Sequence, residues 1–127
     1  MERRFIVPEG MEIIRERFGY NPGVIVGDTL YIAGQVGRDA DLNVVEGAEA
    51  QYIQAFENVG RVLAAAGADF TNVVDMVTYH VDITDLVNFI PIKNRYIKQD
   101  FPAWTGIGVT ALAMPGLLIE IKCVAKL

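Results

Sequence analysis

The sequence predicts an α+β protein in which a mixed β-sheet carries two long helices on one face. Runs rich in β-branched and aromatic residues alternate with two segments of helical periodicity, at 48–66 and 84–97. Each helical segment follows one predicted strand and precedes another, which favours packing of both helices on the same side of one sheet. The 127 residues contain no long linker or internal repeat, so we expect a single domain, 1–127.

The first 18 residues, 1–18, are expected to form an N-terminal extension with a short strand and a short helix. Residues 5–7 form the strand, and Pro8 closes it. Met11, Ile14 and Phe18 then recur at helical spacing, which predicts that all three face inward from a brief amphipathic helix.

A β-hairpin and a long helix come next. Residues 24–26 and 29–33 are β-rich, and the two residues between them are Gly27 and Asp28, which is a hairpin signal. Gly34 is expected to end the return strand. Small and apolar residues recur every three or four positions in 48–66, and Gly67 stands where a C-terminal capping glycine belongs. Asn58 is assigned to the solvent face of this helix.

The second helix follows a long strand at 73–83. Thr84 or Asn88 can cap it, and Pro91 decides between them in favour of Asn88. With Asn88 as the cap, Pro91 falls in the first turn, where its missing N–H has no intrahelical partner. In the helix interior the same proline costs about 3 kcal/mol.

The C-terminal stretch, 101–125, is predicted to be two long strands joined by a turn at Pro115 and Gly116. Glu120 is the unusual residue there, because it stands among aliphatic neighbours. It shares a face with Lys122 by period-2 alternation. Either it points to solvent with a cross-strand partner, or it occupies a pocket in which desolvation raises its pKa.

Composition narrows the classes of function. The net charge of −5 and the lack of a Lys/Arg cluster beyond Arg3-Arg4 argue against nucleic acid as a partner. Apolar residues, counted with glycine and without tyrosine, make up about 57% of the chain against a usual 45 to 50%. This excess predicts that part of the apolar surface forms a contact between identical subunits.

Membrane, metal and cofactor roles are not expected. No apolar run is long enough to span a membrane, and no signal peptide is evident, which favours a cytoplasmic protein. Cys123 is the single cysteine and is interpreted as a buried, unreactive thiol. His80 is the single histidine, so a metal centre is disfavoured and a hydrogen-bonded strand histidine is expected.

Four segments then resemble the RidA (YjgF, L-PSP endoribonuclease) family with similar spacing from about residue 19 to residue 125. They are Gly19-Tyr20-Asn21-Pro22, the VGDTLYIAGQV run at 26–36, Glu57-Asn58-Val59, and the IEIKCVA run at 119–125. The resemblance implies a chorismate-mutase-like fold and a homotrimer. It also implies ligand clefts between neighbouring protomers, in which a small metabolite binds.

Three positions depart from that family's pattern. In its deaminating members an Arg two residues after a proline binds the substrate carboxylate, and here Trp104 takes that place. Arg offers a charged, planar fork, whereas indole offers one N–H and an apolar face. Ala33 stands in place of a serine and Lys93 in place of an asparagine. The resemblance therefore does not extend to the usual hydrolysis of 2-iminoacids.

The remaining candidate residues have roles implied by the resemblance, each beside a plainer interpretation. Tyr20 and Gln35 match and line the cleft, and Glu120 orients or activates water. Trp104 either stacks on a planar ligand or packs in a subunit interface. Arg38 either supplies the missing cation or is a solvated loop charge paired with Asp39. Lys93 is either an exposed helix lysine, which is the favoured interpretation, or a ligand contact.

Three functions are compatible with these residues. The first is a trimer whose clefts bind, or bind and hydrolyse, a small enamine, imine or related planar metabolite. The second is a non-catalytic trimer that senses a ligand or binds a partner, which the three departures favour. The third, an endoribonuclease or translation inhibitor, rests on the family name, and the acidic composition argues against it.

Overall fold

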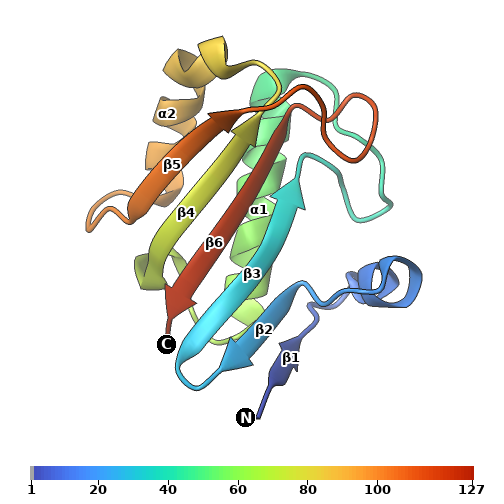
Figure 1. Ribbon diagram of the computed structural model, residues 1–127, viewed down its shortest axis with the longest axis vertical. Coiled ribbons are helices and arrows are strands. Elements are labelled where there is room, and N and C mark those ends of the chain that lie inside the picture. The colour runs from blue at the N-terminus through green and yellow to red at the C-terminus, as the bar shows by residue number, and fades with distance from the viewer. Residues whose placement is uncertain (1) are drawn as a thin grey trace.

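The computed structural model describes residues 2–127, which form one six-stranded sheet covered on one face by two long helices (Figure 1). The strands are β1 (Arg4–Ile6), β2 (Gly23–Val26), β3 (Thr29–Val36), β4 (Val73–His80), β5 (Ala103–Gly108) and β6 (Ile119–Lys126), and the helices are α1 (Ala48–Ala65) and α2 (Leu86–Tyr96). Their order in the sheet is β1-β2-β3-β6-β4-β5, and only β4 and β5 are parallel. The predicted α+β class is confirmed.

The predicted C-terminal hairpin is wrong. β6 lies between β3 and β4 and is antiparallel to both, whereas β5 pairs with β4 at the outer edge. The turn itself exists, since the Leu117 N–H donates to the Met114 carbonyl and Gly116 has a φ of +87°. It lies within a ten-residue loop between the strands, because local turn residues define a reversal of the chain but not the partner of the strand that follows.

Gln51 of α1 holds this loop in place through two hydrogen bonds. Its Nε2 donates to the Gly116 carbonyl at 2.8 Å, and its Oε1 accepts from the Leu118 N–H at 2.8 Å. The side chain is buried, and a Cβ at Gly37 would overlap with it. One buried amide therefore sets both the path of the loop and the close approach of the chain after β3.

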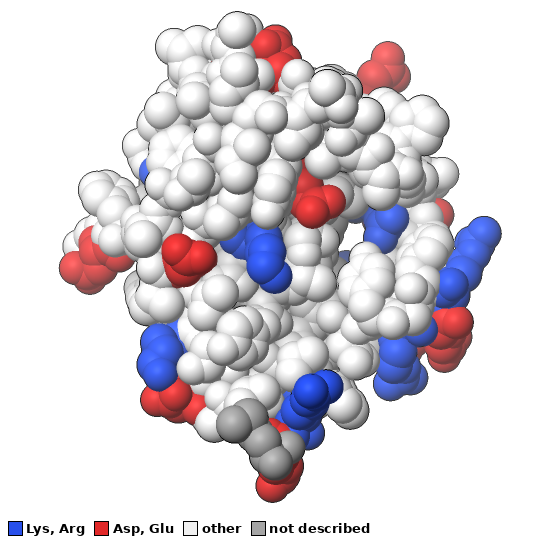
Figure 2. Space-filling view, in the orientation of Figure 1, with Lys and Arg blue, Asp and Glu red and all other residues white. Residues whose placement is uncertain are grey.

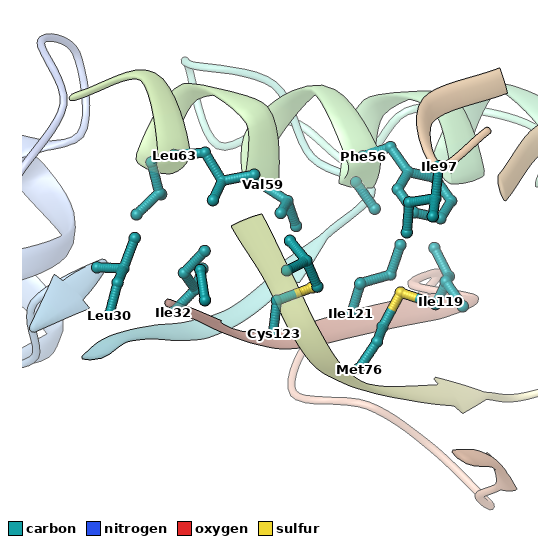
Figure 3. Close-up of a cluster of buried hydrophobic side chains, with 14 of the residues drawn as sticks. Leu30, Ile32, Phe56, Val59, Leu63, Met76, Ile97, Ile119, Ile121 and Cys123 are labelled. Carbon is teal, nitrogen blue, oxygen red and sulfur yellow. The ribbon is translucent and has the colours of Figure 1, made fainter. Parts of the chain in front are cut away.

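The core lies between α1 and the central strands (Figure 3). Burial alternates along β6, where Ile119, Ile121, Cys123 and Ala125 are buried and the residues between them are not. The Cys123 thiol is buried, as predicted from the sequence. Desolvation raises the pKa of this thiol to about 12. Leu30 and Ile32 of β3 and Met76 of β4 face the same helix. Phe56, Val59 and Leu63 meet them from α1.

The start of α2 differs from the prediction. Asp82 caps a short 3-10 turn, Ile83–Asp85, by accepting the Thr84 N–H, and α2 continues directly from that turn. Pro91 therefore lies in the helix interior, and Asn88 is not its cap. The missing N–H leaves the Val87 carbonyl without its intrahelical partner. Both residues are exposed, so water can bond to that carbonyl.

The N-terminal extension has its short strand, β1, and a π-helix at Ile14–Phe18. Met11 and Ile14 are buried as predicted, but Phe18 is 46% exposed, so its inward assignment is wrong. Its ring lies beneath the Arg38 guanidinium instead, 5.4 Å from the ring centroid to Cζ. β3 is also longer than predicted, because a bulge between Ile32 and Gln35 carries Gly34 through without ending the strand.

No helix within residues 2–127 has both the length and the apolar character needed to cross a lipid bilayer.

Asn58 corrects the assignment of the α1 faces, because it is buried rather than exposed. Its Nδ2 donates to the carbonyls of Val36 and Arg38, each at 3.0 Å, and its Oδ1 accepts from Gln54 at 2.9 Å. This amide holds the chain leaving β3 against the helix.

Replacing Asn58 by Ala is expected to lower the free energy of unfolding by about 1–3 kcal/mol, because the carbonyls of Val36 and Arg38 each lose the hydrogen bond that this buried amide donates. Urea unfolding at one fixed protein concentration measures the difference. Gln54→Ala removes the more exposed partner of Asn58 and serves as the control, with a smaller loss. Equal losses in the two variants would contradict the role given to Asn58.

Candidate functional site

The candidate residues fall into two groups, which lie in different parts of the fold. The first, the β3–β6 group, comprises Tyr20, Ala33, Gln35, Arg38 and Glu120. The second, the β5 edge group, comprises Lys93 and Trp104. Each is positioned by different parts of the fold.

Glu120 is the second residue of β6 and lies on the face of the sheet that is turned away from the helices. It pairs with Val36 on one side and Tyr79 on the other. Gly34 at the bulge lies directly against its carboxylate, so that a Cβ at that position would overlap with it. The glycine therefore leaves the space in which the carboxylate lies. In residues 2–127 the carboxylate accepts no hydrogen bond, so its oxygens are available to a ligand or to water.

Burial raises the pKa of Glu120 above its ordinary value, and the charges of Lys122 and Arg38 partly oppose that rise. Burial thus disfavours the charged form of the carboxyl group, whereas the two nearby cations favour it. Of the two interpretations of Glu120, the structure supports the desolvated one. A carboxyl group in this state can accept and return a proton more readily near neutral pH than a fully solvated one.

Arg38 lies just beyond the end of β3. The proposed pairing with Asp39 is absent: the Asp39 carboxylate accepts the N–H groups of Asp41 and Asn43. Arg38 instead stacks on Phe18 and directs Nη1 to the Met114 sulfur at 3.4 Å. No carboxylate in residues 2–127 comes within 4 Å of its guanidinium. A narrow cleft lined by Gly34, Gln35 and Arg38 runs from here to the N-terminal extension.

Of the other members of the β3–β6 group, Gln35 lines this cleft, whereas Ala33 lies earlier on β3 and Tyr20 lies before β2. Gln35 is buried and donates from Nε2 to the Ala33 carbonyl at 3.0 Å. The Ala33 N–H donates to the Pro22 carbonyl at 2.9 Å, which ties β3 to the turn that carries Tyr20. Tyr20 is 39% exposed. The segment around Tyr20 and the strand that carries Gln35 are therefore held side by side.

Trp104 does not join this group within one subunit. It is in register with Met76, whose side chain faces the helices, so its indole lies on the helix side of the sheet, whereas Glu120 faces the opposite side. Its Nε1–H donates to Thr78 Oγ1 at 2.9 Å and is therefore not free for a ligand. Its ring packs against Phe89 at 6.0 Å between centroids. A cleft shared by Trp104 and Glu120 requires a second subunit.

The hydrogen-bond chain continues from Trp104 to His80. Thr78 Oγ1 lies 2.7 Å from His80 Nε2, and both side chains are fully buried. This agrees with the predicted hydrogen-bonded strand histidine. Burial lowers the pKa of His80, and the nearby Asp85 carboxylate opposes that effect. In residues 2–127 no three His, Cys, Asp or Glu side chains are placed to share a metal ion.

The favoured interpretation of Lys93 as an exposed helix lysine is wrong. The residue is 8% exposed, and its Nζ lies 5.1 Å from the centroid of the Trp104 ring and 5.4 Å from that of Phe101. Its hydrogen bond goes to Asn94 Oδ1 at 2.8 Å. Helical spacing alone did not reveal this burial, because the two rings come from the segment after the helix.

The family described as "Endoribonuclease L-PSP" matches residues 13–127. The chain therefore belongs to the L-PSP (RidA/YjgF) family. Human 2-iminobutanoate/2-iminopropanoate deaminase is 42% identical over 108 residues, which cover 84% of this chain and 78% of the human protein.

A second relative in the family matches the N-terminal extension as well. The RutC family protein YjgH of Escherichia coli is 32% identical over 129 residues, covering 100% of this chain and 97% of YjgH. The crystal structure titled "Structural Genomics, Protein YJGH" superposes with a TM-score of 0.91 at 32% identity, covering 100% and 98% of the two chains. The extension is thus a feature that this family member shares with YjgH.

The raised pKa of Glu120 predicts a pH-dependent effect of Glu120→Gln on stability. The folded protein holds the Glu120 proton more tightly than the unfolded chain, so this group stabilises the fold at low pH. That contribution is lost as the pH rises through the folded-state pKa. The variant is therefore expected to exceed the parent protein in free energy of unfolding at about pH 7, and the gain should shrink towards about pH 4.

Urea unfolding at the two pH values measures this difference. Glu46→Gln, which changes an exposed carboxylate in the loop before α1, is the matched control and should show no comparable trend. A variant that is less stable at neutral than at acidic pH, relative to the parent, would show that Glu120 is held in its charged form.

Proposed function

We propose that this chain forms a homotrimer and that the clefts between its subunits bind and hydrolyse a small enamine, imine or related planar metabolite. The single observation that carries the proposal is Glu120, a half-buried carboxyl group with a raised pKa and with free oxygens, held against the Gly34 backbone near Arg38. The deaminase name of the human relative supports the choice of reaction.

The uncovered face of the sheet supports the assembly. Both long helices lie behind the sheet in Figure 1, so Figure 2, in the same orientation, shows the uncovered face. Over most of this face the charged side chains are few and lie apart from one another. On this face Tyr31 pairs with Val124, which is followed by Asp75 on β4, and Val77 and Tyr79 pair with Lys122 and Glu120. Tyr31 is 48% exposed. A mostly uncharged, partly aromatic face of this kind is typical of contacts between identical subunits.

The proposed chemistry is the addition of water to a C=N bond, followed by loss of ammonia. The Glu120 carboxylate accepts a proton from the attacking water as the C–O bond forms and passes it to the nitrogen, which gives a tetrahedral adduct with one hydroxyl and one amino group. The carboxylate then takes the hydroxyl proton and delivers it to the same nitrogen as the C=O bond forms and the C–N bond breaks. The net reaction consumes one water and yields a carbonyl compound and ammonia. A carboxyl group with a raised pKa suits both halves of this cycle near neutral pH.

The substitution of Trp104 supports a substrate that differs from those of the deaminating relatives. A charge-assisted hydrogen bond is worth roughly 1.5–3 kcal/mol, so the loss of an arginine at this position removes about ten- to hundredfold in affinity for a carboxylate held there. The Trp104 N–H cannot replace it, because Thr78 already accepts that hydrogen.

The second candidate is a trimer that binds a ligand or a partner without turnover. Trp104, Ala33 and Lys93 all depart from the family pattern while Glu120 does not. Native mass spectrometry of the purified protein tests it, since a retained small molecule with no turnover in any assay favours binding alone. Ribonuclease activity has no structural support beyond the family's description, given the net charge of −5.

Turnover by the parent protein and its loss in Glu120→Gln form the decisive test. With 2-iminobutanoate generated in situ and a panel of wider enamines, the variant is expected to release carbonyl product about 10²- to 10⁴-fold more slowly. Glu46→Gln should retain the parent rate. No turnover of any substrate, together with no ligand-induced rise in melting temperature, would contradict the proposal, as would a monomer in light scattering at micromolar concentration.

Restoring the family's residues tests the role of position 104. Trp104→Arg alone places a second cation beside Lys93 and is expected to lower the melting temperature. The double variant Lys93→Asn/Trp104→Arg removes this repulsion and is expected to hydrolyse 2-iminobutanoate about tenfold faster than the parent protein. A double variant that folds with the parent melting temperature but gains no activity would show that position 104 does not decide the substrate.

A further inference from the structure

Arg38 is a cation held between two uncharged side chains. Its guanidinium lies over the Phe18 ring, with Cζ 5.4 Å from the ring centroid, and its Nη1 lies 3.4 Å from the Met114 sulfur. The first contact comes from the N-terminal extension and the second from the loop before β6. In residues 2–127 no carboxylate oxygen comes within 4 Å of this guanidinium. Both partners therefore restrict the position of the charge without neutralising it.

Two other charged residues, Asp39 and Arg61, line the same cleft as Arg38. The Asp39 carboxylate accepts two backbone N–H groups of its own loop, at 2.9 and 3.0 Å. The Arg61 guanidinium donates to the Glu9 carbonyl of the N-terminal extension. An ion pair between Arg38 and Asp39 would have cancelled much of the field that the arginine exerts at longer range. Without that pair, the field extends beyond the cleft.

The chain after β3 brings Arg38 close to Glu120. Val36 is the β3 partner of Glu120, and the Arg38 N–H donates to the Val36 carbonyl at 2.8 Å, which turns the chain at the end of the strand. Asn58 fixes this turn by donating to the carbonyls of both Val36 and Arg38. The backbone of Arg38 is therefore fixed two residues beyond the strand pair that contains Glu120. Phe18 and Met114 then fix its side chain.

The charged and titratable groups around Glu120 come from three parts of the fold. Lys122 lies on the same face of β6, Tyr79 is the partner of Glu120 on β4, and Arg38 follows β3. Both cations favour the ionised carboxyl group, and so they oppose the burial that raises its pKa. Lys122 is exposed, so solvent screens its charge, whereas Arg38 is half-buried and held on two sides. The charge of Arg38 is therefore the one that the fold controls.

We propose that Phe18 is a positioning residue, which together with Met114 holds the Arg38 guanidinium where its charge acts on the Glu120 carboxyl group. Through this contact the N-terminal extension sets the pH range in which Glu120 exchanges its proton. An arginine without these supports would extend into solvent, where its charge is screened and no longer acts on the carboxyl group. The inference rests on the proposed function only for its effect on turnover, because the titration of Glu120 is measurable without a substrate.

NMR of the glutamate side-chain carboxyl carbons follows the titration of Glu120, whose signal is the one absent from Glu120→Gln. In Arg38→Met the midpoint is expected to move to higher pH, because the carboxylate loses a cation that favours it. Phe18→Leu removes the ring but stays apolar, and is expected to move the midpoint in the same direction by a smaller amount. In Arg38→Met/Phe18→Leu the second substitution should add nothing, since it acts only through the arginine. Phe18→Tyr retains the ring and should titrate like the parent protein.

Two matched substitutions serve as controls. Arg17→Met removes the other arginine near the Phe18 ring, with Cζ 5.8 Å from the centroid, and should leave the midpoint unchanged because Arg17 is not among the charges that act on Glu120. Phe5→Leu removes another exposed ring of the extension, on β1, and should also have no effect. Met114→Leu removes the sulfur contact and should raise the midpoint, which keeps the two-sided support testable if Phe18→Leu does not fold.

Three results would overturn the inference. They are an unchanged midpoint in Arg38→Met, an unchanged midpoint in a folded Phe18→Leu, and a movement in Arg17→Met as large as that in Arg38→Met. The outcomes also separate the two proposals. Midpoints that move as expected in a protein without turnover contradict the proposed hydrolysis and leave this inference intact. Turnover by the parent protein, with a pH–rate profile and a Glu120 midpoint that are the same in Arg38→Met and Phe18→Leu, contradicts this inference alone.

Discussion

The alternation of side chains along β6 is the constraint on which the structure depends. Because β6 lies between β3 and β4, every second residue must be apolar to meet α1, and the residues between them are directed to the uncovered face. Glu120 occupies one of those intervening positions. Its position on the uncovered face and its partial burial by neighbouring strands follow from one register, and a shift by one residue would place the carboxylate in the core.

Two buried side-chain amides position the chain segments next to the sheet. Gln51 and Asn58 lie on α1. Gln51 bonds to backbone groups of the loop before β6, and Asn58 bonds to carbonyls at the end of β3 and just beyond it. Polar side chains in these positions hold the loop before β6 and the chain after β3 against the helix. As a result, Arg38 and Glu120 are positioned by the same helix that forms the core.

Much of the fold was evident from the sequence, because α1, the β2–β3 hairpin and the mixed sheet follow from local periodicity. The pairing of β5 with β4 was not, since a Pro-Gly turn does not state which strand lies beside the next one. Glu120 could be identified because a carboxylate in an aliphatic strand is unusual. The burial of Lys93 and Asn58 depends on contacts with distant segments, and single-sequence periodicity carries no information about those.

The outer strand of the sheet leaves one border of the subunit open. β5 pairs only with β4, and its sequence, Ala103–Gly108, contains no lysine, proline or bulge. These are the devices by which proteins keep an open strand edge from recruiting foreign chains. An isolated chain is therefore prone to aberrant strand pairing along this border, and its yield in cells would depend on how long the border stays uncovered.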